Sequence, residues 1–354
     1  MGDTSGQGSL ERPHEGRYFS LLEGLRAVAA LSVMAVHFDR VLGSGTSELA
    51  RHVSTTGVAI FFVLSGFLLY RPFSAAIRKR SQRPDTRRFY VRRAARILPA
   101  YWLAFAITSV VIGLSNVTGQ NVLVYLLLLQ DYFDGTRYQG IAPAWSLSIE
   151  ATFYVLLPLG ALALTAIVSA ARGVSPVAIE RACLFGLVTF AVLIQQGTGA
   201  PETILTHLDW FAWGMLGASF AVDRRPLADR TGLVAGAWAG AAVLFVASSD
   251  YFVDGVVAAL LVGSVALLAP VPISKAVLGT RPVLWLGLIS YGIFLWHDPL
   301  INGLYDAGIE SAAALIPATL ALTFAAAALS YYALERPILR AAHKYRPPSP
   351  RASQ

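Results

Sequence analysis

The stretch Leu21-Leu-Glu-Gly-Leu-Arg-Ala-Val-Ala-Ala-Leu-Ser-Val-Met-Ala-Val-His37 decides the fold, because it is an apolar run that contains charged residues. About 20 apolar residues are enough for a helix to cross a bilayer. Arg26 and His37 are eleven residues apart. They therefore share one face of the helix and lie roughly 16 Å apart along its axis. Ionisable residues at membrane depth cost several kcal/mol, roughly 2.5 or more, so both are functional candidates.

Beyond this stretch, the whole chain has the composition of a membrane protein. Of its 354 residues, 55% are hydrophobic and 14% are charged, and the mean hydropathy is +0.57. Soluble domains are about 45–50% apolar and about 25% charged, so a soluble particle is excluded. The net charge of +7 is interpreted as membrane topology and not as nucleic-acid binding. The single cysteine, Cys183, is expected to be a small buried hydrophobe.

The apolar runs predict an all-α fold, a polytopic membrane helix bundle with about ten transmembrane helices. The predicted spans are residues 20–42, 55–71, 98–115, 145–168, 179–196, 207–222, 232–248, 252–269, 283–302 and 313–334. Val122–Leu129 is too short to span and is expected to be interfacial or re-entrant. The membrane domain is predicted at residues 18–340, between a disordered cytoplasmic tail at 1–17 and a cytoplasmic C-terminal tail at 341–354.

The basic residues predict the orientation of the bundle. With the N-terminus inside, 24 of the 28 Lys and Arg residues fall in cytoplasmic segments, ten of them from Arg71 to Arg96. The outside then holds only Arg40, Arg51 and Arg137. Because Lys and Arg gather on the cytoplasmic side, we expect both termini in the cytoplasm and the protein in the cell membrane.

The ionisable residues within or beside the spans sort into two layers. The fourth and ninth predicted spans run in opposite directions, yet their polar residues reach a similar depth in the outer half of the membrane. That outer layer consists of His37, Glu150 and His297, and the inner, arginine-rich layer consists of Arg26, Arg93, Arg96 and Glu335. Polar residues at this depth are costly, so each is a site candidate.

Each candidate also has a structural reading, which the sequence leaves open. These readings are an interhelical hydrogen bond for His37, an ion pair with Glu23 for Arg26, a structural ion pair for Glu150, an aromatic-belt position for His297, and topology signals for Arg93 and Arg96. Two further carboxylates, Asp209 and Asp298, are expected to be interfacial rather than chemical.

Six short segments occur in a fixed order along the chain. They are Leu22-Glu-Gly-Leu-Arg26 with His37, Gly57-Val-Ala-Ile-Phe-Phe-Val-Leu-Ser-Gly-Phe67, Phe89-Tyr-Val-Arg-Arg-Ala-Ala-Arg-Ile-Leu-Pro99, Trp145-Ser-Leu-Ser-Ile-Glu150, Tyr291-Gly-Ile-Phe-Leu-Trp-His297 and Leu334-Glu-Arg-Pro337. In this order they resemble the motifs of the acyltransferase-3 family of integral membrane O-acyltransferases, over about residues 18–340.

The resemblance implies an acyltransferase for groups other than aminoacyl groups. Such a protein moves an acyl group, commonly acetyl, from cytoplasmic acyl-CoA to a hydroxyl of a carbohydrate, glycolipid or similar acceptor at the outer side. The family's key histidine and arginine match His37 and Arg26. Two positions depart from the pattern, Glu23 where Asp is usual and Asp298 where apolar or amide residues are common. The family's C-terminal hydrolase-like extension is not expected here.

Together these expectations give a mechanism that can be tested. His37 would be the general base, Glu150 would orient it, and Arg93 and Arg96 would bind the anionic donor. His297 and Glu335 would support these groups. Acyl-CoA would be a co-substrate, and neither a metal site nor a tightly bound cofactor is expected. The competing reading is a transporter or exporter that uses the buried Arg, His and Glu residues as a relay, against which no inverted repeat is evident.

Overall fold

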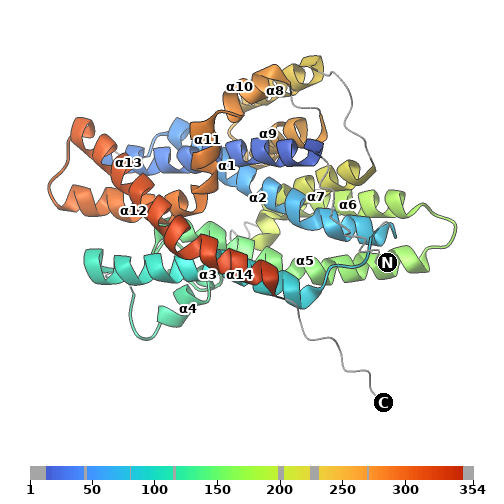
Figure 1. Ribbon diagram of the computed structural model, residues 1–354, viewed down its shortest axis with the longest axis horizontal. Coiled ribbons are helices and arrows are strands. Elements are labelled where there is room, and N and C mark those ends of the chain that lie inside the picture. Colours follow the sequence, from blue (N-terminus) through green and yellow to red (C-terminus); the bar gives the residue numbers. More distant parts are fainter. Residues whose placement is uncertain are drawn as a thin grey trace, which may run out of the picture.

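In the computed structural model, the described residues are 13–43, 46–79, 81–114, 117–197, 203–223, 231–268 and 271–345, with side chains from residue 20 onward. Within these ranges the regular elements are all helices and no strand occurs. Most of them run along the long axis of the molecule (Figure 1). The predicted all-α polytopic helix bundle is thus confirmed.

The helices follow one another with short connections. Their bounds are α1 Pro13–Leu42, α2 Glu48–Ile77, α3 Thr86–Thr108, η1 Ser109–Gly113, α4 Val122–Leu126, η2 Gln130–Tyr132, η3 Ala142–Ala144, α5 Trp145–Ala170, α6 Pro176–Gly197, η4 Ile204–Thr206, α7 Leu208–Asp223, α8 Thr231–Ala247, α9 Tyr251–Leu267, α10 Pro272–Leu278, α11 Arg281–Leu288, α12 Ser290–Asp306, α13 Ala312–Leu329, η5 Ser330–Glu335 and α14 Arg336–Lys344. Of the η elements, η1 and η5 are π-helical and the other three are 3₁₀ turns.

Among the described residues, fewer than ten helices are long enough to cross a membrane alone. Six described helices are long and apolar enough to cross a membrane, and the number is seven if the bent pair α11–α12 forms one span. The predicted spans at 207–222, 232–248 and 252–269 correspond to α7, α8 and α9, of which 16 or 17 residues each are described. A helix that packs inside a bundle need not match the full thickness of the lipid, so an apolar run overestimates the number of full-length spans.

Capping residues explain why two helices begin earlier than the apolar pattern predicts. The Ser47 side chain accepts a hydrogen bond from the backbone N–H of Ala50 and starts α2 at Glu48. The Asp85 side chain accepts one from Arg88 and starts α3 at Thr86. Such caps satisfy backbone donors at a helix start, so polar first turns join the helix ahead of the apolar run.

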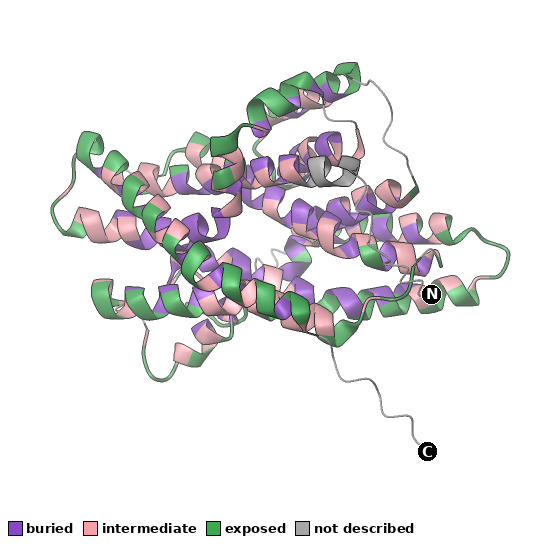
Figure 2. Ribbon diagram, in the orientation of Figure 1, coloured by how far each residue is buried: buried purple, intermediate pink, exposed green. Residues whose placement is uncertain are grey.

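The core of the bundle lies around α2, which packs against α1, α5, α7 and α9 (Figure 2). Two glycines allow α2 and α7 to approach closely. A Cβ at Gly66 would lie 2.2 Å from the carbonyl oxygen of Phe211, and one at Gly214 would lie 2.1 Å from that of Val63. Small residues at helix contacts are typical of membrane bundles, where close packing replaces the hydrophobic effect between helices.

The predicted ninth span at 283–302 is not one straight helix. It is the pair α11 and α12, which are bent by 73° at Ile289. Gly287 lies in the last turn of α11, where a Cβ would be 1.9 Å from the carbonyl oxygen of Glu23 on α1. The bend allows α11 to pack against α1 while α12 runs on into the bundle.

Parts of the two predicted tails are helical where the structure describes them. The described part of helix α1 runs from Pro13, and residues 1–12 lie outside the described part. After α13 the chain continues through η5 into α14, which ends at Lys344. Residues 341–344 of the predicted C-terminal tail are therefore helical, and 346–354 lie outside the described residues.

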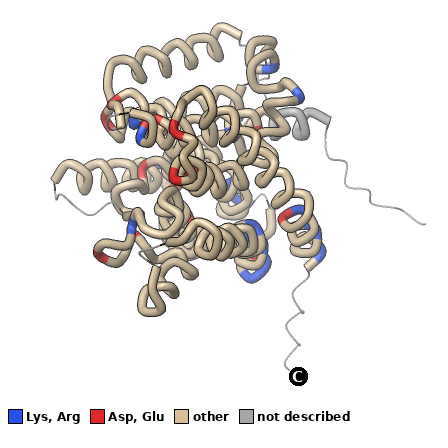
Figure 3. The backbone as a smooth tube through the Cα atoms, turned by 90° about the vertical axis from the view of Figure 1, so that its left-hand side faces the viewer, with Lys and Arg blue, Asp and Glu red and all other residues tan. Residues whose placement is uncertain are grey.

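Contacts between helix ends agree with alternating spans. Arg78 at the end of α2 pairs with Glu180 at the start of α6 and with Asp223 at the end of α7. Arg88 near the start of α3 donates to the carbonyl of His343 near the end of α14. We refer to this side as the arginine-rich end. In the end view of Figure 3, charged residues occur as short blue and red segments between long uncharged stretches of the tube.

Candidate active site

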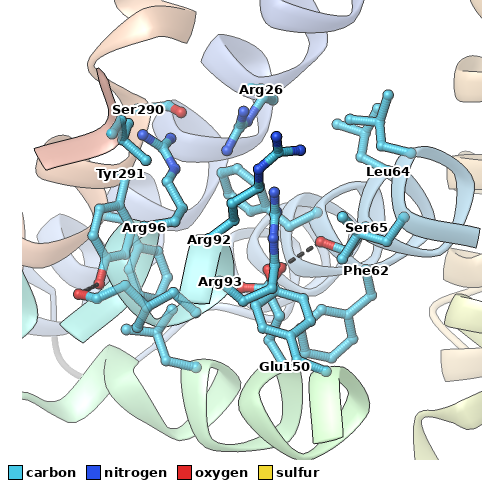
Figure 4. A pocket seen from close by; sticks show the side chains of 18 of the residues that line it. Arg26, Phe62, Leu64, Ser65, Arg92, Arg93, Arg96, Glu150, Ser290 and Tyr291 are labelled. Carbon is cyan, nitrogen blue, oxygen red and sulfur yellow. Dashed lines mark hydrogen bonds between the residues drawn. The ribbon is translucent and has the colours of Figure 1, made fainter. Parts of the chain in front are cut away.

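A cavity of about 390 Å³ lies between α1, α2, α3, α5, α12 and α14, toward the arginine-rich end. Its polar lining comes mainly from α1, α3 and α5 (Figure 4). The charged and polar side chains that line it are Glu23, Arg26, Ser65, Arg92, Arg93, Arg96, Ser146, Glu150, Tyr154, Ser290, Tyr291, Tyr331 and His343. The predicted residues Arg26, Arg93, Arg96 and Glu150 therefore share one cavity.

The four arginines differ in their partners. Arg26 lies 3.6 Å from Glu23, and Arg96 lies 3.1 Å from Glu335 with its guanidinium 5.5 Å from the ring centroid of Tyr291. Within the described part of the chain, no ion pair is recorded for Arg92 or Arg93. The Arg92 Nε is buried without a hydrogen-bond partner among those residues, and Arg93 lies 5.7 Å from the ring centroid of Tyr154.

The charge of the cavity is therefore net positive. Four arginines face two lining carboxylates, Glu23 and Glu150 (Figure 4). Guanidinium groups form forked hydrogen bonds with phosphate and carboxylate, and they cannot lose their charge by deprotonation in a protein. Two of them without carboxylate partners make this cavity suited to a polyanionic ligand.

Glu150 is held by Ser65 rather than by His37. The Ser65 hydroxyl donates a short hydrogen bond to Glu150 Oε1, and Tyr154 lies one helical turn further along α5. No contact between Glu150 and His37 is recorded in the described structure. The predicted pairing of these two residues is thus wrong, because helical rise gives the depth of a side chain but not the direction in which it points.

The histidines form a separate cluster beyond the cavity wall. The His37 and His297 rings are 4.8 Å apart, edge to face. Phe294 lines the cavity, and its ring lies 6.1 Å from that of His297. The cluster therefore begins one turn of α12 further along, away from the arginine-rich end. This confirms that the two histidines share a layer, but not that Glu150 belongs to it.

His37 has a different carboxylate neighbour, Asp298. The His37 Nδ1 lies 2.9 Å from Asp298 Oδ1, and the Asp298 side chain is only 5% exposed. Asp298, which was expected to be interfacial rather than chemical, is thus buried among polar partners. Asp209, the other carboxylate predicted to be interfacial, is also buried, with a hydrogen bond from Gln195.

Two residues of this region, Arg92 and Asp298, were not among the predicted site residues and could have been. Arg92 and Arg96 are four residues apart and so share one face of α3, but Arg92 was counted only within the basic run. Asp298 directly follows His297, and a second ionisable residue in an apolar segment is itself unusual. By contrast, the ion pair of Arg26 with Glu23 was one of the readings left open.

The chain thus forms a membrane-type helix bundle with an arginine-lined cavity and, beyond it, the neighbouring histidines His37 and His297. Residues 19–335 match the acyltransferase domain family, and the chain belongs to this family. No solved structure matches the chain.

Curated relatives support the same assignment. YrhL of Bacillus subtilis (strain 168) is 28% identical over 324 residues, covering 80% of this chain and 49% of the relative. The peptidoglycan O-acetyltransferase OatA of Listeria monocytogenes is 26% identical over 320 residues, covering 81% of this chain and 50% of the relative. The O-acetyltransferase OatA of Staphylococcus aureus is 24% identical over 378 residues, covering 97% and 60%. The chain thus spans about half the length of the curated relatives it matches.

Proposed function

We propose that this protein is a membrane O-acyltransferase that moves an acyl group, acetyl in the simplest case, from acyl-CoA to a hydroxyl of a carbohydrate or glycolipid. The observation that carries the proposal is the cavity with four arginines, two of them without a recorded carboxylate partner. Family membership and the names of the relatives favour acyl transfer over a transport relay.

The cavity suits the donor because acyl-CoA carries its negative charges at one end. The phosphates of its nucleotide would bind Arg92 and Arg93, where each charge-assisted hydrogen bond is worth about 1.5–3 kcal/mol. Arg26 lies in the same cavity, roughly 16 Å before His37 along α1. The thin pantetheine arm would extend past Arg26 and past Phe294 toward the histidine cluster. Acyl-CoA is a co-substrate in this scheme.

The chemistry needs a base at the far end of this path. Neutral His37 would accept the proton of the acceptor hydroxyl while its oxygen attacks the thioester carbonyl. The tetrahedral intermediate then collapses with cleavage of the carbon–sulfur bond. The leaving thiolate takes the proton from His37, so that the products are the ester and free CoA. His297, with its ring against that of His37, would shape the position of the reacting groups.

The acceptor would enter from the side opposite the arginine-rich end. There Arg40 is 42% exposed while it contacts the buried Asp298. The Listeria relative is named for peptidoglycan, so a sugar hydroxyl of peptidoglycan or of its precursors is the first acceptor class to test. Under this proposal the arginine-rich end faces the cytoplasm and the protein lies in the cell membrane.

The test uses the full chain purified in detergent and reconstituted in lipid nanodiscs. Calorimetry should show saturable binding of acetyl-CoA. Cells that express the chain should incorporate label from acetyl-CoA into glycans or glycolipids, detected by mass spectrometry. His37→Ala should keep donor binding and lower turnover by about 10²–10⁴. A wild-type chain that neither binds acetyl-CoA nor changes any extracted glycan would overturn the proposal and favour the transport reading.

A further inference from the structure

Asp298 is the polar centre of the region beyond the cavity. Its Oδ1 lies 2.9 Å from His37 Nδ1, 2.7 Å from Arg40 Nη2 and 3.1 Å from Asn302 Nδ2. One buried oxygen therefore faces three nitrogen groups. A carboxylate in this setting is held as an acceptor, because an isolated buried charge would be too costly without such donors.

The surrounding contacts hold this carboxylate in place. Asn302 also donates to the backbone carbonyl of Asp298 at 2.8 Å, one turn before it on α12. The Asn302 Oδ1 accepts from Arg40 Nη2 at 3.2 Å. Arg40 comes from α1, the helix that carries His37, so the two donors from α1 and the one from α12 converge on the same atom. Asp298 thereby fixes the relative position of the two helices at this depth.

The contacts also decide where the proton of each histidine lies. His37 Nδ1 lies 2.9 Å from Asp298 Oδ1 as an ion-pair contact, although the alignment falls outside hydrogen-bond geometry. A carboxylate oxygen can only accept, so the contact favours the tautomer with the hydrogen on Nδ1. The lone pair is then on Nε2, which is free to act as a base. In His297, Nδ1 lies 2.9 Å from the carbonyl of Ile293, which likewise places its hydrogen on Nδ1. Its Nε2 is buried without a partner among the described residues.

We propose that Asp298, held by Arg40 and Asn302, is the positioning residue that keeps His37 in the Nδ1–H form and stabilises its protonated state during acyl transfer. This inference rests on the proposed function and assigns to Asp298 the role that the sequence had suggested for Glu150. Catalytic triads use a carboxylate in this way, and an amide in its place favours the wrong tautomer.

The test measures turnover and donor binding of four variants in nanodiscs. Asp298→Asn should lower kcat by about 10²–10⁴ while the Kd and KM for acetyl-CoA change less than about threefold. Asp298→Glu keeps a carboxylate and should restore at least about a tenth of the lost activity. The double variant His37→Ala with Asp298→Asn should be no slower than His37→Ala alone, because residues that act as one unit are non-additive.

The matched control is Asp254→Asn. Asp254 is another buried carboxylate beside a histidine, 3.2 Å from His52 Nδ1, and it accepts a hydrogen bond from Thr56. The Asp254→Asn substitution should lower stability about as much as Asp298→Asn does, but it should leave kcat unchanged. If Asp298→Asn does not fold, Asp298→Leu is measured instead, since Arg40 is exposed enough to turn to water.

The outcomes separate this inference from the proposed function. If Asp298→Asn or Asp298→Leu keeps wild-type kcat while His37→Ala is inactive, the positioning role is overturned and acyl transfer stands. If Asp254→Asn loses as much kcat as the Asp298 variants, the effect is one of stability and the inference fails. A wild-type chain that binds no acetyl-CoA and transfers nothing would remove the proposed function itself.

Discussion

Arg96 and Glu335, 239 residues apart in the sequence, form an ion pair at the cavity wall, with Arg96 Nη1 3.1 Å from Glu335 Oε2. Glu335 is 2% exposed and ends the π-helical element η5, where the Ser330 hydroxyl also donates to it. The pair therefore joins α3 to the junction of α13 and α14. A substitution of Arg96 alone would test this junction as well as the donor site.

The Arg96–Glu335 pair predicts a stability effect that is not additive. Removing one partner of a buried pair leaves an unpaired charge and costs about 3–5 kcal/mol, whereas removing both does not. Arg96→Ala and Glu335→Ala should each lower the melting temperature in detergent. The double variant should melt above the less stable single variant. Equal and additive losses would show that the two side chains contribute independently.

Arg92 and Arg93 give a cleaner test of donor binding, because no recorded ion pair is broken when they are changed. Each Ala substitution should weaken acetyl-CoA affinity by about tenfold or more, the equivalent of one charge-assisted hydrogen bond. Lys at either position should recover only part of this, since an ammonium lacks the fork of a guanidinium. Arg87→Ala is the matched control, because Arg87 lies on the same helix, is exposed and does not line the cavity. Equal losses of acetyl-CoA affinity in Arg92→Ala, Arg93→Ala and Arg87→Ala would indicate a general effect of positive charge.

The sequence was sufficient for the type of fold but not for its details. Apolar runs predict where helices exist because each must hide its backbone from lipid. They do not predict where a helix begins, since capping by Ser47 and Asp85 sets the starts of α2 and α3. They also do not predict the bend at Ile289. That bend depends on the contact of Gly287 with α1, which is a tertiary feature.

For the site, the sequence predicted several of the residues that line the cavity but not which side chains contact one another. Arg26, Arg93, Arg96 and Glu150 were expected to matter and do line one cavity. The ion pair of Arg26 with Glu23 was among the readings left open, but the partners of Glu150 and His37 could not be predicted, because the rotation of α5 and α12 about their axes decides which side chains meet. Glu150 turns toward Ser65, and Asp298 takes the place beside His37.

Gly287 offers a test of the packing that produces the bend. A Cβ there would lie 1.9 Å from the Glu23 carbonyl oxygen, so Gly287→Ala must push α11 away from α1. We expect a clear drop in melting temperature and a loss of acetyl-CoA binding, because Glu23 lines the cavity. Gly160→Ala on α5 is the control, since nothing lies within 4 Å of its added Cβ. That variant should be neutral or more stable by about 0.5–1 kcal/mol. If both variants behave alike, the close approach has no energetic role.

The orientation is testable with single cysteines at two exposed positions. In a Cys183→Ser background, Ser81→Cys follows α2 at the arginine-rich end, and Gly119→Cys lies in the connection after η1. Impermeant maleimide should label Gly119→Cys in intact cells and Ser81→Cys only after the membrane is opened. Because both positions are exposed, burial cannot explain a difference. The reverse labelling pattern would invert the predicted topology.

The short helix α8 has a consequence for the surrounding lipid. Its 17 described residues measure about 25 Å, several ångströms less than a typical hydrocarbon core of about 30 Å. Its side chains Leu233, Val243 and Val246 are 51%, 66% and 85% exposed, so in a membrane they would contact the acyl chains. A bilayer beside α8 must become thinner to cover them, which is hydrophobic mismatch. The length of the host lipids' acyl chains thereby becomes a variable that acts on this bundle, and membranes of shorter lipids should hold it with less strain than thick ones.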